Sequence, residues 1–212
     1  MKGASKNHIG VNELYTNREA LIQELLNHFD HFPEVTNVAL RGSIVSGETG
    51  RFSDIDLLIE GTFSNIETFA ALLLQRTDDR FEIEFFDWAT SLLPHEYVVT
   101  FYFKNTSIFW NIDVQLVSNS LYKPFSKFIN NPTHHLIKLW ILNLKYLQRQ
   151  QYDKLTVEKL ARKCGLTDDN VPYPHTMRKI LENIQNQSDT NVRFFLLACE
   201  KELEIYEKQF IQ

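Results

Sequence analysis

The spacing of apolar residues along this chain changes once, near residue 124. Before that point, short runs rich in β-branched, aromatic and aliphatic residues indicate strands, and two longer runs have the three-to-four-residue spacing of amphipathic helices. The predicted strands cover residues 35–42, 54–60, 81–88, 97–104 and 107–117, and the predicted helices cover 17–29 and 65–76. Asn105 and Thr106 separate the last two strands as a hairpin turn would, so we expect a mixed sheet with antiparallel members toward one end.

The second part of the chain has only helical periodicity. Thr133 and Thr156 stand where helix N-caps belong, and Gly165 stands where a helix ends in a left-handed residue. The predicted helices cover residues 133–150, 156–165, 174–185 and 191–210. We therefore expect an α+β chain, in which a domain with a mixed β-sheet at 1–123 precedes an all-helical bundle domain at 124–212.

Composition and charge narrow the function. With 43% hydrophobic residues, the chain of 212 residues has ample material for a packed core. Its net charge of -5 is the opposite of the basic surface that nucleic-acid binding needs, so we do not expect nucleic acid as a partner. The first residues lack the apolar core of a signal peptide, and no uncharged apolar run approaches the ~20 residues that span a bilayer. These features predict a cytoplasmic protein with no membrane partner.

The candidate chemistry lies in residues 40–60, which read LRGSIVSGETGRFSDIDLLIE. Asp54 and Asp56 stand two apart at the start of a predicted strand, so both carboxylates project from the same face. A buried carboxylate is costly unless a cation compensates it, and Mg²⁺ prefers carboxylate and phosphate oxygens. Gly42 lets the backbone approach a phosphate closely, and the Ser43 hydroxyl is a hydrogen-bond donor beside it. The segment therefore predicts a triphosphate site next to a metal site.

Six residues of this segment match a known signature. Their pattern, GSxxxGxxxxxSDxD, resembles the signature of the DNA polymerase β type nucleotidyltransferase superfamily, and the resemblance extends over residues 35–118. The matching residues are Gly42, Ser43, Gly47, Ser53, Asp54 and Asp56. The resemblance implies a sheet-based palm in which the two aspartates hold a pair of Mg²⁺ ions. It also implies that Gly42 and Ser43 hold the β and γ phosphates of a nucleotide.

The loop between the two strands departs from the family pattern at one position. Many small members carry an arginine where this chain has Ser46. Arg51, later in the same loop, is the candidate that supplies the missing positive charge to the nucleotide. Ser53 precedes the first aspartate and is also a candidate nucleotide-binding residue.

The resemblance further implies a third carboxylate, which comes from a neighbouring strand. Asp113 is the first candidate, because Ile112 and Val114 on either side of it would face the opposite side of the sheet. Asp113 would complete the metal site and help to activate the acceptor hydroxyl. Glu84 and then Asp87, both in an earlier predicted strand, are the alternatives.

Three basic residues form a charged stripe on the predicted helix at 133–150, namely Lys138, Lys145 and Arg149. Such a stripe usually marks a solvated helix face. In the enzymes that the chain resembles, the helical domain closes over the nucleotide and lends a lysine to the triphosphate. Lys145 is therefore a candidate nucleotide-binding residue.

These features predict a Mg²⁺-dependent nucleotidyltransferase, which moves a nucleoside monophosphate from a nucleoside triphosphate to a hydroxyl of a small molecule and releases pyrophosphate. The size, the acidic balance and the helical tail resemble the antibiotic-modifying members, which act on lincosamides and aminoglycosides. Two alternatives stay open: a protein-modifying or antitoxin-type nucleotidyltransferase, and a module that binds a nucleotide without catalysis. An exposed apolar patch on the helical part would favour a partner protein.

Overall fold

Five strands form one mixed sheet in the computed structural model of the chain, which describes residues 17–93, 95–118, 130–151, 153–166, 173–188 and 190–210. The strands are β1 (Val35–Arg41), β2 (Ile55–Gly61), β3 (Ile83–Trp88), β4 (Tyr97–Phe103) and β5 (Ile112–Ser118), in the spatial order β1-β2-β5-β4-β3. Among the described strands, β2 and β5 alone pair in parallel. The predicted mixed sheet is confirmed, but its antiparallel pairs lie at both ends of the sheet and not at one.

The connection between β4 and β5 is longer than the predicted two-residue turn. The predicted strand at 107–117 begins only at Ile112, because Ile108 and Phe109 leave the sheet and pack into the core of the helical part. Asn105 does have the left-handed backbone of a turn residue, with φ of 62°. Residues 104–111 thus form a loop whose apolar side chains tie the sheet to the helices.

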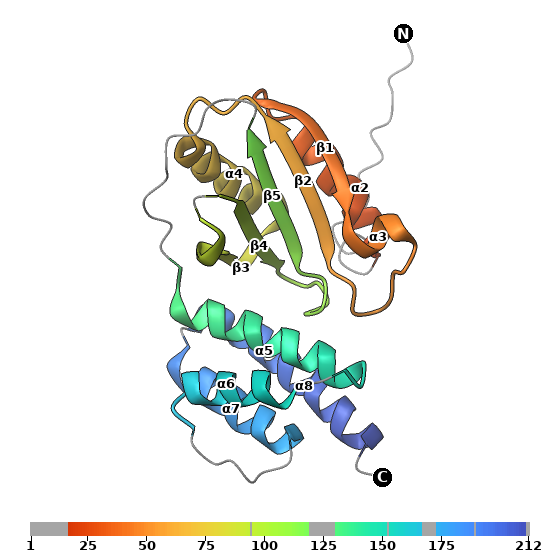
Figure 1. Cartoon of the computed structure of the whole chain (residues 1–212), viewed down its shortest axis with the longest axis vertical. Coiled ribbons are helices and arrows are strands. Elements are labelled where there is room, and N and C mark those ends of the chain that lie inside the picture. Colours follow the sequence, from red (N-terminus) through yellow and green to blue (C-terminus); the bar gives the residue numbers. More distant parts are fainter. Residues whose placement is uncertain are drawn as a thin grey trace.

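Two helices cover one face of the sheet. α2 (Arg18–Asp30) and α4 (Ile66–Phe81) lie behind the strands in Figure 1 and share a buried core with them. Burial in β2 alternates from residue to residue, with Ile55, Leu57 and Ile59 inside. Each such side chain contributes ~1.5–3 kcal/mol when it leaves water, and this determines which face of the strand turns inward. The residues between them therefore lie on the opposite face.

The helical part packs around a second core. Its helices are α5 (Pro132–Gln148), α6 (Lys154–Lys163), α7 (Tyr173–Gln187) and α8 (Arg193–Phe210). α5 lies nearest to the sheet in Figure 1, and Trp140 in its middle is fully buried. Phe85 of β3 and Tyr102 of β4 belong to the same buried cluster. The sheet and the helices therefore meet through side chains of α5, β3 and β4.

Two helix caps lie earlier than predicted. The Asn131 side chain accepts a hydrogen bond from the Thr133 backbone N–H at 2.9 Å, so α5 begins at Pro132. Asp153 likewise caps α6, and the Thr156 hydroxyl only donates to its carboxylate. Asparagine and aspartate cap as well as threonine does, and proline suits the first helical position, which explains both shifts. Gly165 has φ of 74° just beyond α6, as predicted.

Three short helical segments complete the described structure: α3 (Gly42–Ser46), η1 (Thr90–Leu92) and η2 (Thr190–Val192). The predicted domain boundary, between residues 123 and 124, lies outside the described residues, so the division into 1–123 and 124–212 stays a prediction. None of the helices in the described ranges combines the length and the apolar character that crossing a membrane requires.

Candidate active site

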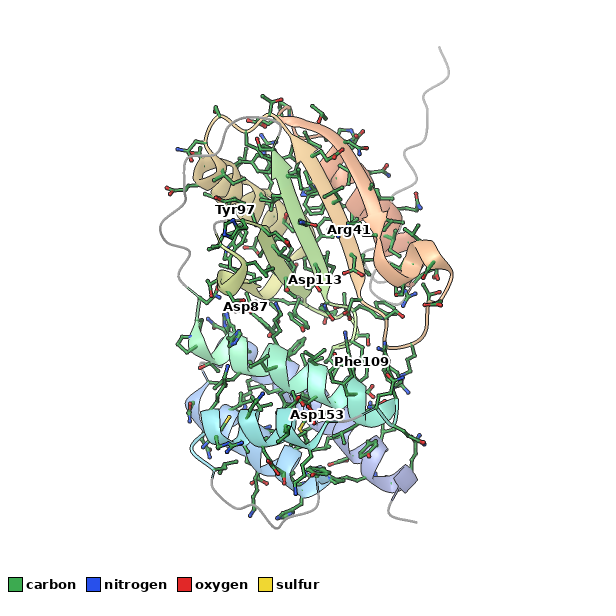
Figure 2. The ribbon with its side chains drawn as sticks, in the orientation of Figure 1. Arg41, Asp87, Tyr97, Phe109, Asp113 and Asp153 are labelled. Atoms are coloured by element: carbon green, nitrogen blue, oxygen red, sulfur yellow. The ribbon has the colours of Figure 1, made fainter. Side chains whose placement is uncertain are left out.

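One row of polar residues crosses the sheet on the face that α2 and α4 leave open. Strand register pairs Arg41 with Asp56, Asp56 with Asp113, Asp113 with Thr100, and Thr100 with Asp87. Paired residues of neighbouring strands project to the same side, so these five side chains share one face. Figure 2 labels Arg41, Asp113 and Asp87 along this line. We call these five residues the polar row.

The centre of the polar row is a pair of carboxylates. Asp56 and Asp113 are directly opposite each other in the parallel pair β2–β5, and Asp54 lies two residues before Asp56. Burial raises the pKa of Asp56, and the nearby Asp113 and Asp54 carboxylates raise this pKa further. Burial also raises the pKa of Asp113, against the opposing effects of Lys138 and the Thr100 hydroxyl. The three carboxylates that the sequence named as candidates, Asp54, Asp56 and Asp113, thus lie close to one another in the structure.

Gly42 is held by its backbone and by a close neighbour. It opens α3 with φ of 64°, a conformation that costs other residues ~1–2 kcal/mol. A Cβ atom on Gly42 would overlap Oδ2 of Asp56 and lie 3.0 Å from its Cγ. Ser43 follows in α3, and its carbonyl accepts the Glu48 N–H at 3.1 Å. The glycine therefore makes room for a carboxylate of the site, a reason that sequence reasoning had not identified.

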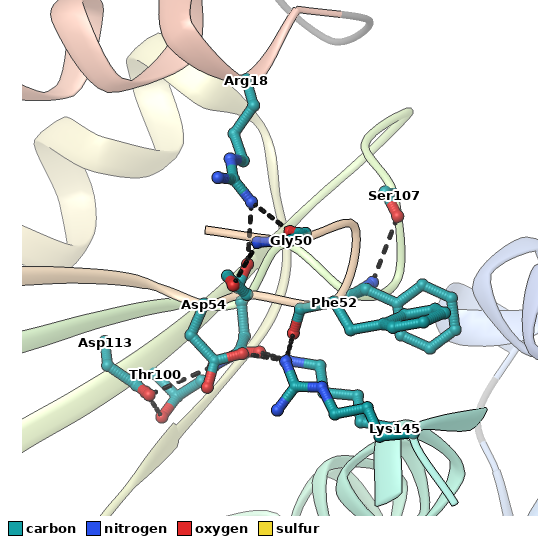
Figure 3. A network of polar contacts seen from close by, with 12 residues as sticks. Arg18, Gly50, Phe52, Asp54, Thr100, Ser107, Asp113 and Lys145 are labelled. Carbon is teal, nitrogen blue, oxygen red and sulfur yellow. Dashed lines mark hydrogen bonds and ion pairs between the residues drawn. The ribbon is translucent and has the colours of Figure 1, made fainter. Parts of the chain in front are cut away.

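Lys145 reaches the site from α5. Its side chain is only 4% exposed, and its ammonium donates to Oδ1 of Asp54 and to Oδ1 of Asn111 (Figure 3). Burial lowers the pKa of Lys145, and the charge of Asp54 opposes that effect. The interpretation of this helix stripe as a solvated face is wrong for Lys145. It holds for Arg149, which is exposed and donates to the Phe52 carbonyl at 2.8 Å.

Both oxygens of Asp113 receive hydrogen bonds. The Thr100 hydroxyl donates to Oδ1, and Nδ2 of Asn111 donates to Oδ2 at 3.1 Å. Nζ of Lys138 in turn donates to Oγ1 of Thr100 at 2.7 Å. Sequence reasoning missed Thr100 and Asn111. The position of Asn111, two residues before Asp113, was the available signal, because it predicts a shared face.

The loop before β2 is held by residues that do not line the central cleft. Arg51 forms an ion pair with Glu202 of α8, at 2.8 Å. The Ser53 hydroxyl accepts the Gly50 N–H at 2.9 Å, and Arg18 of α2 donates to the Gly50 carbonyl at 2.9 Å (Figure 3). Arg51 and Ser53 thus contact the loop itself and the helical part. Their binding to a nucleotide stays a prediction.

The two alternatives for the third carboxylate lie further away. Asp87 belongs to the polar row, but β4 separates its strand from β5, which places the two strands roughly 10 Å apart. Glu84 lines a separate cavity of about 120 Å³, beside Asn131 and Thr133 at the start of α5. Strand register therefore favours Asp113 as the carboxylate that acts with Asp56.

A cleft of about 330 Å³ opens over the polar row. Its lining residues are Arg41, Gly42, Asp56, Leu57, Glu96, Val98, Asp113, Gln115 and Lys138. Within the described ranges, no group of three or more aspartate, glutamate, histidine or cysteine side chains is arranged so that it could hold a metal ion. The oxygens of Asp56 and Asp113 nevertheless suit a hard cation, because burial raises the pKa of both carboxyls and a bound cation would favour their charged forms.

The family described as nucleotidyltransferase domain matches residues 22–162, more than half of the chain, and the chain belongs to this family. The chain is therefore a nucleotidyltransferase with an α+β fold, whose donor substrate is a nucleoside triphosphate. Enzymes of this family typically use divalent metal ions. No curated protein matches the sequence.

Two solved structures are similar to the chain. The first is a STING-associated CdnE c-di-GMP synthase from Capnocytophaga granulosa, with 12% identity and a TM-score of 0.34; the match covers 94% of this chain and 81% of that one. The second is the polymerase core of TRAMP, an RNA surveillance complex, with 15% identity and a TM-score of 0.33. That match covers 98% of this chain and 61% of the other. Neither likeness assigns a substrate to this chain.

Proposed function

We propose that the chain is a Mg²⁺-dependent enzyme, which transfers a nucleoside monophosphate from a nucleoside triphosphate to a hydroxyl of a small acceptor. The observation that carries this proposal is the in-register pair Asp56 and Asp113, which lines the cleft together with Gly42. Asp54, Asp56 and Asp113 are the proposed ligands of two Mg²⁺ ions. When bound, such ions offset the charge of the phosphates and of the attacking oxygen.

The residues of the site then have distinct tasks. Gly42 and Ser43 would bind the β and γ phosphates at the end of β1. The acceptor oxygen attacks the α-phosphorus, the bond to the bridging oxygen of the β-phosphate breaks, and pyrophosphate leaves. Asp113 would accept the proton of the acceptor hydroxyl, because it lines the cleft next to Asp56. Lys145 stabilises the charge of Asp54 and is the proposed lysine that approaches the triphosphate.

A cationic small molecule suits the cleft, whose lining has three acidic and two basic residues. Gln115 follows Asp113 on the same face of β5, and Glu96, just before β4, also lines the cleft. The net charge of -5 also favours the encounter with a cation. An aminoglycoside or a lincosamide carries both an amine and several hydroxyls, so these antibiotics are the proposed acceptors.

A screen tests the acceptor class. The chain is incubated with Mg²⁺ and each α-labelled nucleoside triphosphate, together with aminoglycosides or lincosamides, and label transfer and pyrophosphate release are both measured. We expect a labelled antibiotic and an equal amount of pyrophosphate. Pyrophosphate release in a cell lysate, without any labelled antibiotic, would contradict this acceptor class.

A protein acceptor is the second candidate, because the helical part has exposed apolar side chains. Phe194 is 82% exposed and Leu197 is 49% exposed, and the two lie three residues apart on α8. Residues with this spacing project from the same helix face, and exposed apolar side chains of this size favour a partner protein. If the lysate assay labels a protein band, and Phe194→Ser abolishes that label, the partner is a protein.

A further inference from the structure

Asp87 is a buried carboxylate at one end of the polar row. Its side chain is 1% exposed, and its Oδ1 atom is buried without a hydrogen-bond partner among the described residues. Phe85, on the same face of β3, packs into the helical core. Burying a charged carboxylate costs several kcal/mol unless other groups compensate it. An apolar residue would pack here at a lower cost, so the carboxylate calls for a reason beyond packing.

Two side chains of α5 approach the Asp87 carboxylate. Nδ1 of His135 lies 3.1 Å from Oδ2, and Nζ of Lys138 lies 3.4 Å from the same oxygen. The two contacts differ in what lies beyond them. The His135 side chain is 41% exposed, whereas Lys138 lines the cleft and also donates to Thr100. Only the contact with Lys138 leads toward the candidate active site.

Thr100 joins Lys138 to Asp113. Its side chain is fully buried, and its hydroxyl has a single proton, which it donates to Oδ1 of Asp113. The Lys138 ammonium donates to the same hydroxyl oxygen, which leaves that proton to Asp113. The series Asp87, Lys138, Thr100 and Asp113 is therefore continuous, and three of its members belong to the polar row.

We infer that Asp87 is a positioning residue, which holds Lys138 against Thr100 and thereby orients the Asp113 carboxylate toward the acceptor hydroxyl. This inference rests on the proposed function, because it assigns Asp113 the proton of the acceptor. The competing explanation is a purely structural contact, a latch, in which Asp87 only stabilises the packing of α5 against β3. A latch would use His135 and Lys138 alike, whereas positioning requires Lys138 alone.

Matched variants distinguish the two explanations. Asp87→Asn and Lys138→Gln should each lower kcat about 10- to 100-fold, the usual effect of losing a group that supports a site residue. The KM for Mg²⁺–ATP should stay within about threefold, because the phosphate-binding residues are untouched. His135→Gln removes the other contact of Asp87 and should keep kcat near the wild-type value. Equal losses of kcat in His135→Gln and Lys138→Gln would overturn the inference.

Thr100 supplies a second kinetic test. Thr100→Val keeps the shape but loses the hydroxyl, and should reproduce the loss of kcat, whereas Thr100→Ser should restore most of it. In the double variant Asp87→Asn, Thr100→Val, the loss of kcat should equal the larger of the two single losses, because both substitutions break the same series of hydrogen bonds. Losses that multiply in the double variant would show independent action and would overturn the inference.

Crystal structures of the variants give a readout that needs no activity. In Asp87→Asn, we expect Nζ of Lys138 to leave Thr100 and the Asp113 carboxylate to turn, whereas His135→Gln keeps both in place. An unmoved Asp113 in Asp87→Asn would contradict the positioning role. If the wild-type chain releases no pyrophosphate with any acceptor, the proposed function fails, and these structures alone decide the inference.

Discussion

Replacing Gly42 with alanine tests whether this glycine makes room for Asp56. Gly42 and Gly47 both have a left-handed backbone, with φ of 64° and 75°. A methyl group at Gly42 would overlap the Asp56 carboxylate, whereas nothing lies within 4 Å of the same position at Gly47. Gly47→Ala is therefore a control with the same backbone cost and without the overlap.

The expected magnitudes follow from this difference. Each alanine should lower the free energy of unfolding by ~1–2 kcal/mol, the cost of a Cβ atom in the left-handed region. Gly42→Ala must also displace the Asp56 carboxylate, which a Cβ atom would overlap. A shift of about 1 Å in a reacting group typically costs on the order of 10²-fold in rate. Gly42→Ala should therefore lose about 10²-fold in transfer, and Gly47→Ala should lose less than about tenfold.

Two assays suffice for this comparison. Urea unfolding gives the stability of each variant, and pyrophosphate release with Mg²⁺–ATP and an acceptor from the screen gives the rate. Equal rates for the two alanine variants would refute the claim that Gly42 protects the position of Asp56.

Three further predictions use the same assays. Asp113→Asn should lower the rate of transfer by about 10²- to 10⁴-fold, as the loss of a general base does, whereas Glu84→Gln should change this rate far less. A larger loss of rate in Glu84→Gln than in Asp113→Asn would mean that Glu84 is the third carboxylate. Lys145→Met should lower the free energy of unfolding by about 1–3 kcal/mol in metal-free buffer, because it removes the charge that pairs with Asp54. Added Mg²⁺ should stabilise this variant more than the wild type, because the ion replaces the lost positive charge. Equal stabilisation of the two proteins by Mg²⁺ would contradict this role of Lys145. Burial, together with the charge of Arg80, lowers the pKa of His28 from 6.5 to about 4. The unfolded chain therefore binds the proton more tightly than the folded one does. The contribution of neutral His28 to the free energy of unfolding is complete above pH 6.5 and should fall as the pH drops toward 4. Because His28 is only partly buried, we expect a loss of about 1–2 kcal/mol, which His28→Phe should abolish in a pH series of urea unfolding curves.

Much of the fold was predictable, because its elements depend on local spacing. The alternation predicted for residues 54–60 placed Asp54 and Asp56 on one face, although β2 itself begins only at Ile55. The same alternation in β5 placed Asp113 between buried neighbours. Both patterns are properties of single strands. The candidate aspartates could therefore be named from periodicity and from the resemblance, before any tertiary contact was known.

The rest of the site depends on pairings that no local pattern contains. Thr100 contacts Asp113 only because β4 pairs with β5. The order of strands in a sheet cannot be deduced from the spacing of apolar residues within either strand. Lys145 turns inward because α5 docks on the sheet with that side, and periodicity alone cannot tell a solvated stripe from a docked one. Arg51 was placed near the nucleotide by its position in the loop, yet Glu202 of α8 draws it to the helical part.

Pyrophosphate release from Mg²⁺–ATP, with wild-type chain and with the double variant Asp54→Asn, Asp56→Asn, tests the central claim most directly. Both reactions are run with the pooled aminoglycosides and lincosamides, and a third reaction contains the wild-type chain with EDTA. A metal-dependent transferase predicts release by the wild-type chain with Mg²⁺, and a rate at least about 10²-fold lower in the other two reactions. Release at the same rate in EDTA or in the double variant would contradict the assignment of this site.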